Sequence, residues 1–313
     1  MARKKKRTSL LSKTFNLLIS LTLIIAILAG VVCLYFYCVE KGYIEPFFDT
    51  TEPDTQGSDS IGNVEFHFIS IGQGDAALIR TPEGDIVIDS GRGKDEHLLK
   101  KYLDSCGVRV IKYAIFTHPH EDHIGGADTV LRNYTVEKVI MPDCTATTQA
   151  YKTMLKYIEA EGCEVYEAMT NDVYELGKFK MTVLSPDPEA EYGSNYNNYS
   201  VVLKAEWGNT SAIFTGDAEK EAEAYILSKF SSDFLKSDLL KVGHHGSHTS
   251  STKEFLKTIS PKVAVISCGA GNEYGHPHKP TINALNSLAI KIRRTDTEGN
   301  IVYCSNGTSI TEK

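Results

Sequence analysis

The stretch Thr117-His118-Pro119-His120-Glu121-Asp122-His123-Ile124-Gly125-Gly126 decides the chemistry and the fold of this chain. Three histidines and two acids lie within six residues here, directly after the apolar run Tyr113–Phe116, which predicts a strand. A strand that ends in such a loop brings neutral imidazole and carboxylate groups into a small volume. A divalent ion such as zinc prefers that ligand set. The alternative is a His-rich surface loop, and matching residues later in the chain count against it.

Length and charge bound the class of protein. The chain has 313 residues, of which 42% are hydrophobic, enough for one large domain or two small ones. Residues 1–39 hold six basic side chains and no acid, so the remainder of the chain contains 27 of the 33 basic residues and all 40 acidic ones. An acidic body argues against a broad electrostatic grip on nucleic acid, although it permits a local basic groove or a metal-centred one. The seven cysteines form no Cys-x-x-Cys pair, which predicts neither a disulfide framework nor a zinc knuckle.

The N-terminal residues predict a membrane anchor. Residues 1–13 form a basic head, and an apolar run of 23 residues without a charge extends from Leu17 to Val39. This run is long enough to span a bilayer as a helix, so we assign residues 14–39 to one transmembrane helix. The basic head favours a cytoplasmic N-terminus, which predicts a single-pass protein of the cell membrane with an extracytoplasmic catalytic domain. A cleaved signal peptide is the alternative, but the run exceeds the usual core of such peptides and no Ala-x-Ala site follows.

The remainder predicts a tether and one large domain. Residues 40–62 are rich in Pro, Gly, Ser, Thr and acids, which indicates a flexible tether. Residues 63–313 carry strand patterns followed by helix patterns, first from 64 to 166 and again from 173 onward; one helix is predicted over 124–134. Two such halves predict two packed sheets with helices outside. The expected fold class is therefore α/β (α+β), as an αββα sandwich.

Polar residues gather where the predicted strands end. They are Asp89, the group from His118 to His123, Asp217, His244-His245 and His276-Pro277-His278. If these ends converge, one or two divalent metals, zinc or manganese, find ligands between the two sheets. His118 and His120 would hold one ion, Asp122 and His123 the other, Asp217 would bridge both, and His244 would complete the second. We expect hydrolysis by a metal-bound hydroxide, since two metals can share one, and no Ser or Cys nucleophile is then needed.

His118-x-His120-x-Asp122-His123 resembles the signature of the metallo-β-lactamase fold superfamily of metallohydrolases. The resemblance implies the αββα fold, the ligand set above, and Asp89 as a carboxylate that orients a ligand. One departure is visible, because the superfamily usually supplies a further histidine before the bridging Asp. No histidine occurs from Ile124 to Gly243. Water or an oxygen donor would replace it, and the candidate donors are Asn195, Asn197, Asn198 and Ser200.

Four further motifs resemble the extracytoplasmic hydrolase domain of the ComEC family of DNA-uptake proteins. They are Gly72-Gln73-Gly74-Asp75-Ala76, Asn197–Leu203, Leu240–Ser247 and Tyr274-Gly275-His276-Pro277-His278. The resemblance covers about residues 63–305 and is specific, because several motifs match in order. It implies phosphodiester hydrolysis, since the family's domain is associated with nuclease activity. The multi-helix channel of that family has no counterpart in this sequence, so no role in DNA transport is implied.

The remaining candidate residues are assigned to the reaction or its support. Asp122, His245, His276 and Lys241 are the predicted catalytic residues, of which the histidines and the lysine would bind phosphate or protonate the leaving oxygen. Asp89, Asn198, Ser200, Ser247 and His278 are predicted to support the ligands or the substrate. Structural alternatives stay open: turn caps for Asp89 and Ser247, a helix cap for Asp217, packing for His245 and His276, and a rim position for His278.

These features predict a membrane-anchored, metal-dependent phosphodiesterase or nuclease. Its expected partners are a phosphodiester substrate such as DNA and, through the N-terminal helix, the membrane; no obligate protein partner is inferred. A phosphoesterase acting on head groups of a surface polymer or a small molecule is one alternative, and the acidic body suits it. A β-lactamase-like hydrolase and a non-catalytic anchored binding protein are the others.

Overall fold

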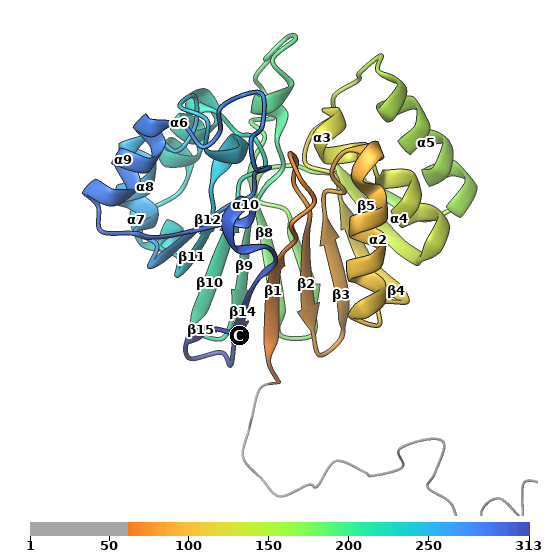
Figure 1. The fold of residues 1–313 in the computed structure, drawn as a ribbon, viewed down its shortest axis with the longest axis horizontal. Helices are drawn as coiled ribbons and strands as arrows, with labels where there is room; N and C mark the ends of the chain where they lie inside the picture. Colours follow the sequence, from red (N-terminus) through yellow and green to blue (C-terminus); the bar gives the residue numbers. More distant parts are fainter. Residues whose placement is uncertain (1–61) are drawn as a thin grey trace, which may run out of the picture. The chain divides into compact units, whose positions relative to one another are not determined.

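The computed structural model describes residues 62–313 (Figure 1). The basic head, the predicted anchor at 14–39 and nearly all of the tether lie outside the described residues. Within the described part, no helix is both long and apolar enough to cross a membrane.

The first sheet has eight strands in the order β15-β14-β1-β2-β3-β4-β5-β6. Its strands are β1 (Val64–Phe68), β2 (Ala77–Thr81), β3 (Gly84–Ile88), β4 (Val110–Ile115), β5 (Thr135–Met141), β6 (Glu164–Glu167), β14 (Ile301–Ser305) and β15 (Ile310–Glu312). β1, β2 and β3 pair antiparallel, whereas β3 to β6 run parallel. The helical segments of this half are η1 (Gly93–Asp95), α2 (Glu96–Ser105), α3 (Glu121–Ile124), α4 (Ala127–Asn133) and α5 (Gln149–Glu161).

The second sheet has seven strands in the order β13-β12-β11-β10-β9-β8-β7. Its strands are β7 (Val173–Leu176), β8 (Phe179–Ser185), β9 (Val202–Trp207), β10 (Thr210–Phe214), β11 (Leu239–Lys241), β12 (Val263–Ile266) and β13 (Lys291–Arg294). Its helical segments are η2 (Tyr196–Tyr199), α6 (Lys220–Lys229), α7 (Ser232–Leu235), η3 (Gly243–Gly246), α8 (Lys253–Ile259), α9 (Lys279–Ser287) and α10 (Thr295–Glu298). β10 to β13 run parallel.

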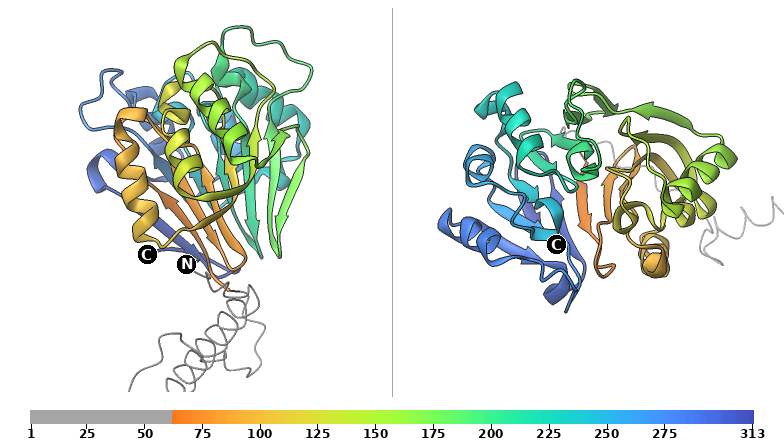
Figure 2. Two further views of the ribbon diagram at one scale, coloured as in Figure 1. Left: turned by 90° about the vertical axis from the view of Figure 1, so that its right-hand side faces the viewer. Right: turned by 90° about the horizontal axis from the view of Figure 1, so that it is seen from above.

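Three apolar cores hold the layers together. The central core lies between the two sheets, where Phe66 and Phe68 of β1 meet Phe214 of β10, and the rings of Phe68 and Phe214 stack 5.7 Å apart. The other two cores fill the space between each sheet and its own helices. Viewed from above, the helices of each half lie on the outer sides of the paired sheets (Figure 2). The αββα sandwich expected from the sequence is therefore the observed architecture.

The predicted helix over 124–134 is wrong in its boundaries. The structure has two helices here, the single turn α3 and then α4, separated by Gly125 and Gly126. A Cβ atom on Gly125 would lie 2.4 Å from the backbone nitrogen of Gly93, so the chain bends where two segments approach closely. This bend lets the loop after β3 pack against α3.

Parallel strand pairs bring the polar loops to one edge of the sandwich. β3 and β4 are parallel neighbours in the first sheet, and β10 and β11 are parallel neighbours in the second. The loops that follow parallel strands emerge at the same edge of a sheet, which is where α/β proteins bind ligands. Asp89, His118–His123, Asp217 and the segment η3 all follow these four strands.

Candidate metal centre

The first half contributes histidines from the loop between β4 and α3. Asp89 fixes the start of this loop, since its two carboxylate oxygens accept hydrogen bonds of 2.8 Å from the backbone N–H and the hydroxyl of Thr117. Beyond it, Nε2 of His118 and Nδ1 of His120 lie 3.0 Å apart. His123 follows on α3 with its ring fully buried. Three imidazoles thus face the gap between the sheets.

The second half contributes the carboxylate of Asp217. Its Oδ2 lies 3.8 Å from Nε2 of His118 and 3.6 Å from Nε2 of His244. Its Oδ1 lies 3.1 Å from Nε2 of His123 and 3.8 Å from Nε2 of His245. Each oxygen therefore faces a different pair of histidines, which is the arrangement of a carboxylate placed to bridge two cations.

A left-handed turn directs His244 and His245 to the same side. Their φ angles are 49° and 52°, and they lie between Gly243 and Gly246 in η3. Successive residues of an extended strand point to opposite faces. The left-handed turn instead lets both rings reach Asp217, at a backbone cost on the order of 1–3 kcal/mol for each non-glycine residue. Such strain is characteristic of binding and catalytic sites.

The structure places His245, predicted as a catalytic residue, at the position that the sequence assigns to His244. His245, rather than His244, lies beside the second set of ligands, with Nε2 3.3 Å from Oδ2 of Asp122. His244 lies on the side of His118, where the superfamily's missing histidine is expected. The physical reason is the left-handed turn, which a linear reading of Gly243-His244-His245 does not reveal.

The four proposed oxygen donors make hydrogen bonds around the centre, and Oδ1 of Asn197 is buried without a hydrogen-bond partner. Asn195 and Asn197 donate to the carboxylate of Glu219 at 3.0 and 3.1 Å. Asn198 accepts from the backbone N–H of Glu219 and donates to Glu221. The hydroxyl of Ser200 accepts from the backbone N–H of Asp217 and lies beside Nδ1 of His118, the nitrogen that faces away from Asp217. These four side chains therefore hydrogen-bond to residues that flank the histidines and Asp217.

In three of the histidines, a carboxylate lies near Nδ1, the ring nitrogen that faces away from Asp217. Asp89 lies 2.7 Å from Nδ1 of His123, the position expected of a carboxylate that orients a ligand. Glu219 lies 3.3 Å from Nδ1 of His244, which is also 3.1 Å from the Thr249 hydroxyl. Asp75 lies 3.4 Å from Nδ1 of His245, which donates its hydrogen bond to the backbone oxygen of Ser267 at 3.0 Å. Metal-binding histidines commonly carry such a partner, which fixes the ring and its tautomer. Asp75 is predicted from the sequence only as part of a family motif, and no sequence signal points to Glu219.

Lys241 is not placed to contact a substrate. Its ammonium group is buried and donates to Oδ2 of Asp75 at 2.6 Å and to the backbone oxygen of Val242 at 2.9 Å. The predicted catalytic role is therefore corrected to a supporting one, since Lys241 neutralises the carboxylate behind His245. Ser247 caps its own turn, because its hydroxyl accepts from the backbone N–H and the hydroxyl of Thr249.

Buried polar atoms at the centre fit a cation. Nε2 of His123, Oδ1 of Asp217 and Nε2 of His245 are buried and have no hydrogen-bond partner. Burying such atoms unpaired is costly, and native proteins rarely do so without an ion or water. Two groups, Asp75-His123-Asp217-His245 and His118-His120-Asp217, each offer ligand atoms within 4.8 Å of one another. The residues therefore form a metal-binding site of histidine and aspartate, a donor set that suits zinc and manganese alike.

Burial and charge tune these groups for a cation. Burial lowers the pKa of His118 well below its usual range, so the ring is neutral, as a ligand must be. Burial alone would raise the pKa of Asp217, but the charges of His123 and His245 hold it well below its usual range. Burial alone would also lower the pKa of His245, and the carboxylates of Asp217 and Asp75 raise it to about 10. Without a metal, the second set of ligands retains a proton in place of the ion.

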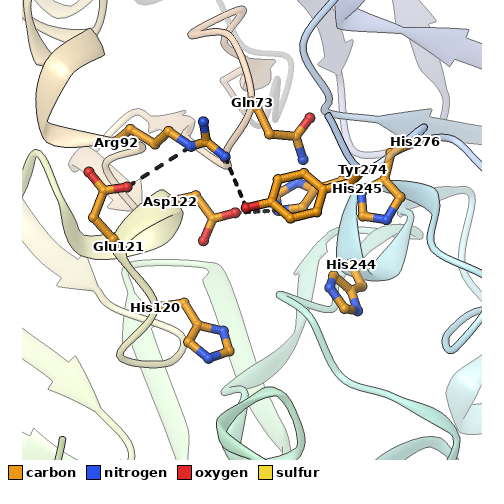
Figure 3. Close-up of a pocket in the computed structure, with 9 residues that line it drawn as sticks. All are labelled: Gln73, Arg92, His120, Glu121, Asp122, His244, His245, Tyr274 and His276. Atoms are coloured by element: carbon orange, nitrogen blue, oxygen red, sulfur yellow. Dashed lines mark hydrogen bonds and ion pairs between the residues drawn. The ribbon is translucent and has the colours of Figure 1, made fainter. Parts of the chain in front are cut away.

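An open pocket of about 330 Å³ leads to this centre (Figure 3). Its lining residues are Gln73, Arg92, His120, Glu121, Asp122, His244, His245, Tyr274 and His276. Burial and the neighbouring histidines lower the pKa of His276 to about 4, so this ring is neutral at pH 7. His278 lies outside the lining as a half-buried residue, with Nδ1 accepting from the backbone N–H of His248. The sequence analysis gave no role to Gln73, Arg92 or Tyr274.

Comparisons with known proteins agree with this geometry. The family described as "Metallo-beta-lactamase superfamily" matches residues 69–270. "ComE operon protein 3" of Bacillus subtilis (strain 168) is 35% identical over 257 residues, covering 76% of this chain and 33% of that protein. "Recombination protein 2" of Haemophilus influenzae is 30% identical over 238 residues, covering 74% of this chain and 28% of that protein. The chain thus spans about a third of the length of these relatives.

The fold is also found among solved structures. The metallo-beta-lactamase fold protein YhfI from Bacillus subtilis superposes with a TM-score of 0.54 at 11% identity, covering 78% of this chain and all of that one. At this identity the likeness concerns the fold alone. The family match extends over most of the described domain and includes the ligands that converge on Asp217. This chain is therefore a metal-dependent hydrolase of the metallo-beta-lactamase superfamily, with homologues among the ComEC-like competence proteins.

Proposed function

We propose that this protein is a membrane-anchored phosphodiesterase that cleaves nucleic acid outside the cytoplasm. The observation that carries the proposal is the carboxylate of Asp217, which presents one oxygen to each of two sets of ligands at the base of an open pocket. The first ion would be held by His118, His120, Asp217 and His244. The second would be held by Asp122, His123, Asp217 and His245.

The residues of the chain supply positioning and proton transfer. When bound, divalent ions held by these residues would polarise a phosphoryl oxygen and lower the pKa of a water molecule. Asp122 lines the pocket, and its Oδ2 lies 3.3 Å from Nε2 of His245 in the second ligand set. His276 lines the pocket as a neutral ring, so it can accept a proton or a hydrogen bond at the reacting group but has no imidazolium proton for the leaving oxygen. Arg92 brings a positive charge to the pocket wall, where it can hold a phosphate oxygen.

The names of the relatives favour a nucleic-acid substrate over a β-lactam. One of them is named "Recombination protein 2", and recombination is an event of DNA. Because residues 40–313 are acidic overall, they would repel the phosphates of a long duplex, whereas a short segment can bind at the pocket alone. The proposed substrate is therefore a single-stranded or frayed end that the pocket can admit.

Hydrolysis assays across substrates and metals test this function. The purified chain, stripped by a chelator and restored with Mn²⁺ or Zn²⁺, should cleave oligonucleotides and a model phosphodiester, and Asp122→Ala should cleave neither. Activity that survives Asp122→Ala would contradict hydrolysis through metal ions held by this ligand set. A preference for phosphocholine esters or for a β-lactam over oligonucleotides would show that the substrate belongs to that class instead. A folded protein with less than one metal per chain and no activity would indicate a binding protein.

The location rests on residues 14–39, whose 23-residue apolar run can cross a bilayer. We expect the chain to fractionate with membranes and to resist extraction by high salt. An external protease should degrade the hydrolase domain in cells whose membrane is intact. Recovery of a mature N-terminus near residue 40 by mass spectrometry would show a cleaved leader instead.

A further inference from the structure

We propose that Tyr274 and Arg92 form a subsite for one nucleotide of the substrate, with the base stacked on the Tyr274 ring and a backbone phosphate at the Arg92 guanidinium. This inference rests on the proposed function and deepens it. It assigns a recognition element at the pocket rim to two residues that the metal chemistry does not use.

Tyr274 lies at the outer end of a row of three nearly parallel rings. The centroids of Tyr274 and His276 are 5.6 Å apart with an interplanar angle of 21°. Those of His276 and His245 are 6.0 Å apart with an angle of 29°. Because His245 faces the metal ligands, the row runs from the rim to the centre. A base stacked on the outer face of Tyr274 would continue the row, and its adjoining phosphates would lie toward the pocket.

The ring of Tyr274 is exposed yet held in place. It is 51% exposed, among the most exposed large apolar side chains of the described chain. The loop that carries it is fastened by Asn272, which donates to the backbone oxygens of Gly269 and His276 at 2.9 and 2.7 Å and accepts from the N–H of His276 at 2.9 Å. A flat ring on a fixed loop loses little freedom on binding. Such rings are the usual stacking platforms of proteins that bind single-stranded nucleic acid.

Arg92 brings a positive charge to the same rim. Its Cζ lies 5.8 Å from the centroid of the Tyr274 ring, and Nη2 donates to the Tyr274 hydroxyl at 3.4 Å (Figure 3). The nearest acids are Glu273 at 3.7 Å and Glu121 at 4.0 Å, both beyond hydrogen-bond distance. The guanidinium therefore keeps donors for a phosphate. The two acids reduce the net charge of the rim, which suits one phosphate better than a long polyanion.

Oligonucleotides with and without bases separate stacking from phosphate binding. The metal-restored full chain is assayed for cleavage of oligothymidylate and of an oligomer with the same backbone but abasic nucleotides. We expect a KM about tenfold lower for the base-bearing oligomer, the size expected for one stacked base. Tyr274→Ala and Tyr274→Leu should lose this preference, whereas Tyr274→Phe and Tyr274→Trp should keep it. Arg92→Ala should weaken both oligomers and reduce the salt dependence of binding.

Tyr166→Ala serves as the matched control, because Tyr166 is another exposed tyrosine, on the edge strand β6 away from the pocket lining. Binding is measured separately with a slowly cleaved phosphorothioate oligomer that contains 2-aminopurine, whose fluorescence reports stacking. A base preference that survives Tyr274→Ala, or cleavage without any base preference, would overturn the subsite and leave the proposed function standing. Tyr274-dependent stacking without cleavage of any oligomer would support the subsite and overturn the phosphodiesterase. Absence of binding to every oligomer would overturn both.

Discussion

The order of His244 and His245 decides which ligand set each residue completes. Because Nε2 of His244 faces Oδ2 of Asp217 and Nε2 of His245 faces the second set, each single substitution should empty a different site. His244→Ala should bind one ion per chain and retain the second site. His245→Ala should bind one ion and retain the first. Metal content measured by mass spectrometry, with the spectra of bound Co²⁺ to identify the site, distinguishes the two.

His278→Ala is the control for this experiment, since His278 is half-buried and lies outside the pocket lining. It should bind as much metal as the parent chain. Loss of the same site in His244→Ala and His245→Ala would contradict the assignment.

The two sites should differ in their response to pH. Without metal, Asp217 and Asp75 hold the pKa of His245 at about 10, so this ring carries a proton at neutral pH that an ion must displace. Affinity at the second site should therefore rise about tenfold per pH unit between pH 6 and pH 8 for each proton released. Burial lowers the pKa values of His118 and His120, so those rings are already neutral, and affinity at the first site should change little. Competition titrations with a chelating dye measure both slopes, and equal slopes would contradict this account.

The buried pair of Asp75 and Lys241 should be strongly coupled. Lys241→Met leaves the carboxylate of Asp75 buried without its main partner, and Asp75→Asn leaves the ammonium group of Lys241 buried without its carboxylate. Each variant should lower the free energy of unfolding by about 3 kcal/mol. The double variant should lose less than the sum of the two by at least about 1 kcal/mol. Chemical denaturation measures these values.

Lys262→Met is the surface comparison, because Lys262 pairs with Asp238 at 2.8 Å while its side chain is 79% exposed. It should cost less than about 1 kcal/mol. Additive losses in the Asp75 and Lys241 variants would show that the two groups act independently.

At this scale the sequence predicts the ligand types well and their partners less well. His118, His120, Asp122, His123 and Asp217 are brought together as the motif spacing indicates. The placement of His245, rather than His244, in the second ligand set depends on the sign of φ in η3, and the flanking glycines only hint at it. Contacts such as Glu219 to His244 depend on the approach of distant segments, which no local pattern encodes.

Among the elements, the turn between β10 and α6 sets the position of the bridging carboxylate. Gly216 has φ of 50°, and a Cβ atom there would lie 2.9 Å from the hydroxyls of Ser200 and Thr117. Gly216→Ala should therefore displace Asp217, with loss of both ions and a fall in stability of about 2 kcal/mol or more. Metal content and the melting temperature measure the two effects.

Gly162→Ala is the matched control, since Gly162 also has a left-handed φ, 71°, but nothing lies within 4 Å of its Cβ position. It should cost about 1 kcal/mol and leave the metal content unchanged. If Gly216→Ala bound metal normally, the turn would not position the bridge.

The strands and their order of appearance follow from alternation in the sequence, as β1 to β3 illustrate. The break between α3 and α4 does not, because α3 is a single turn of four residues and shows no periodicity of its own. The bend is required by the close approach of Gly93 to Gly125, a contact between segments distant in sequence.

For the whole molecule, the centre joins the two halves of the sandwich. His118, His120, Asp122 and His123 follow β4 in the first sheet, whereas Asp217, His244 and His245 follow β10 and β11 in the second. Ions held by both halves stabilise the folded state only, by about 2.7 kcal/mol at a hundredfold excess over the dissociation constant. Chelation should therefore lower the melting temperature by about 5–10 °C. A melting temperature indifferent to chelation would contradict a metal shared by both sheets.

The layered architecture is the part that the sequence predicts best, because two successive strand-and-helix sets leave few other ways to bury their apolar faces. The convergence of both halves on Asp217 is a property of the assembled sandwich. It follows only once the parallel neighbours of each sheet are known.

Oligonucleotide hydrolysis by the metal-restored chain and by Asp217→Asn tests the central claim most directly. The account predicts metal-dependent cleavage by the parent chain and a loss of at least about a hundredfold in Asp217→Asn, which lacks the carboxylate charge that bridges the two ligand sets. Undiminished cleavage by Asp217→Asn, or equal cleavage in the presence of chelator, would contradict it.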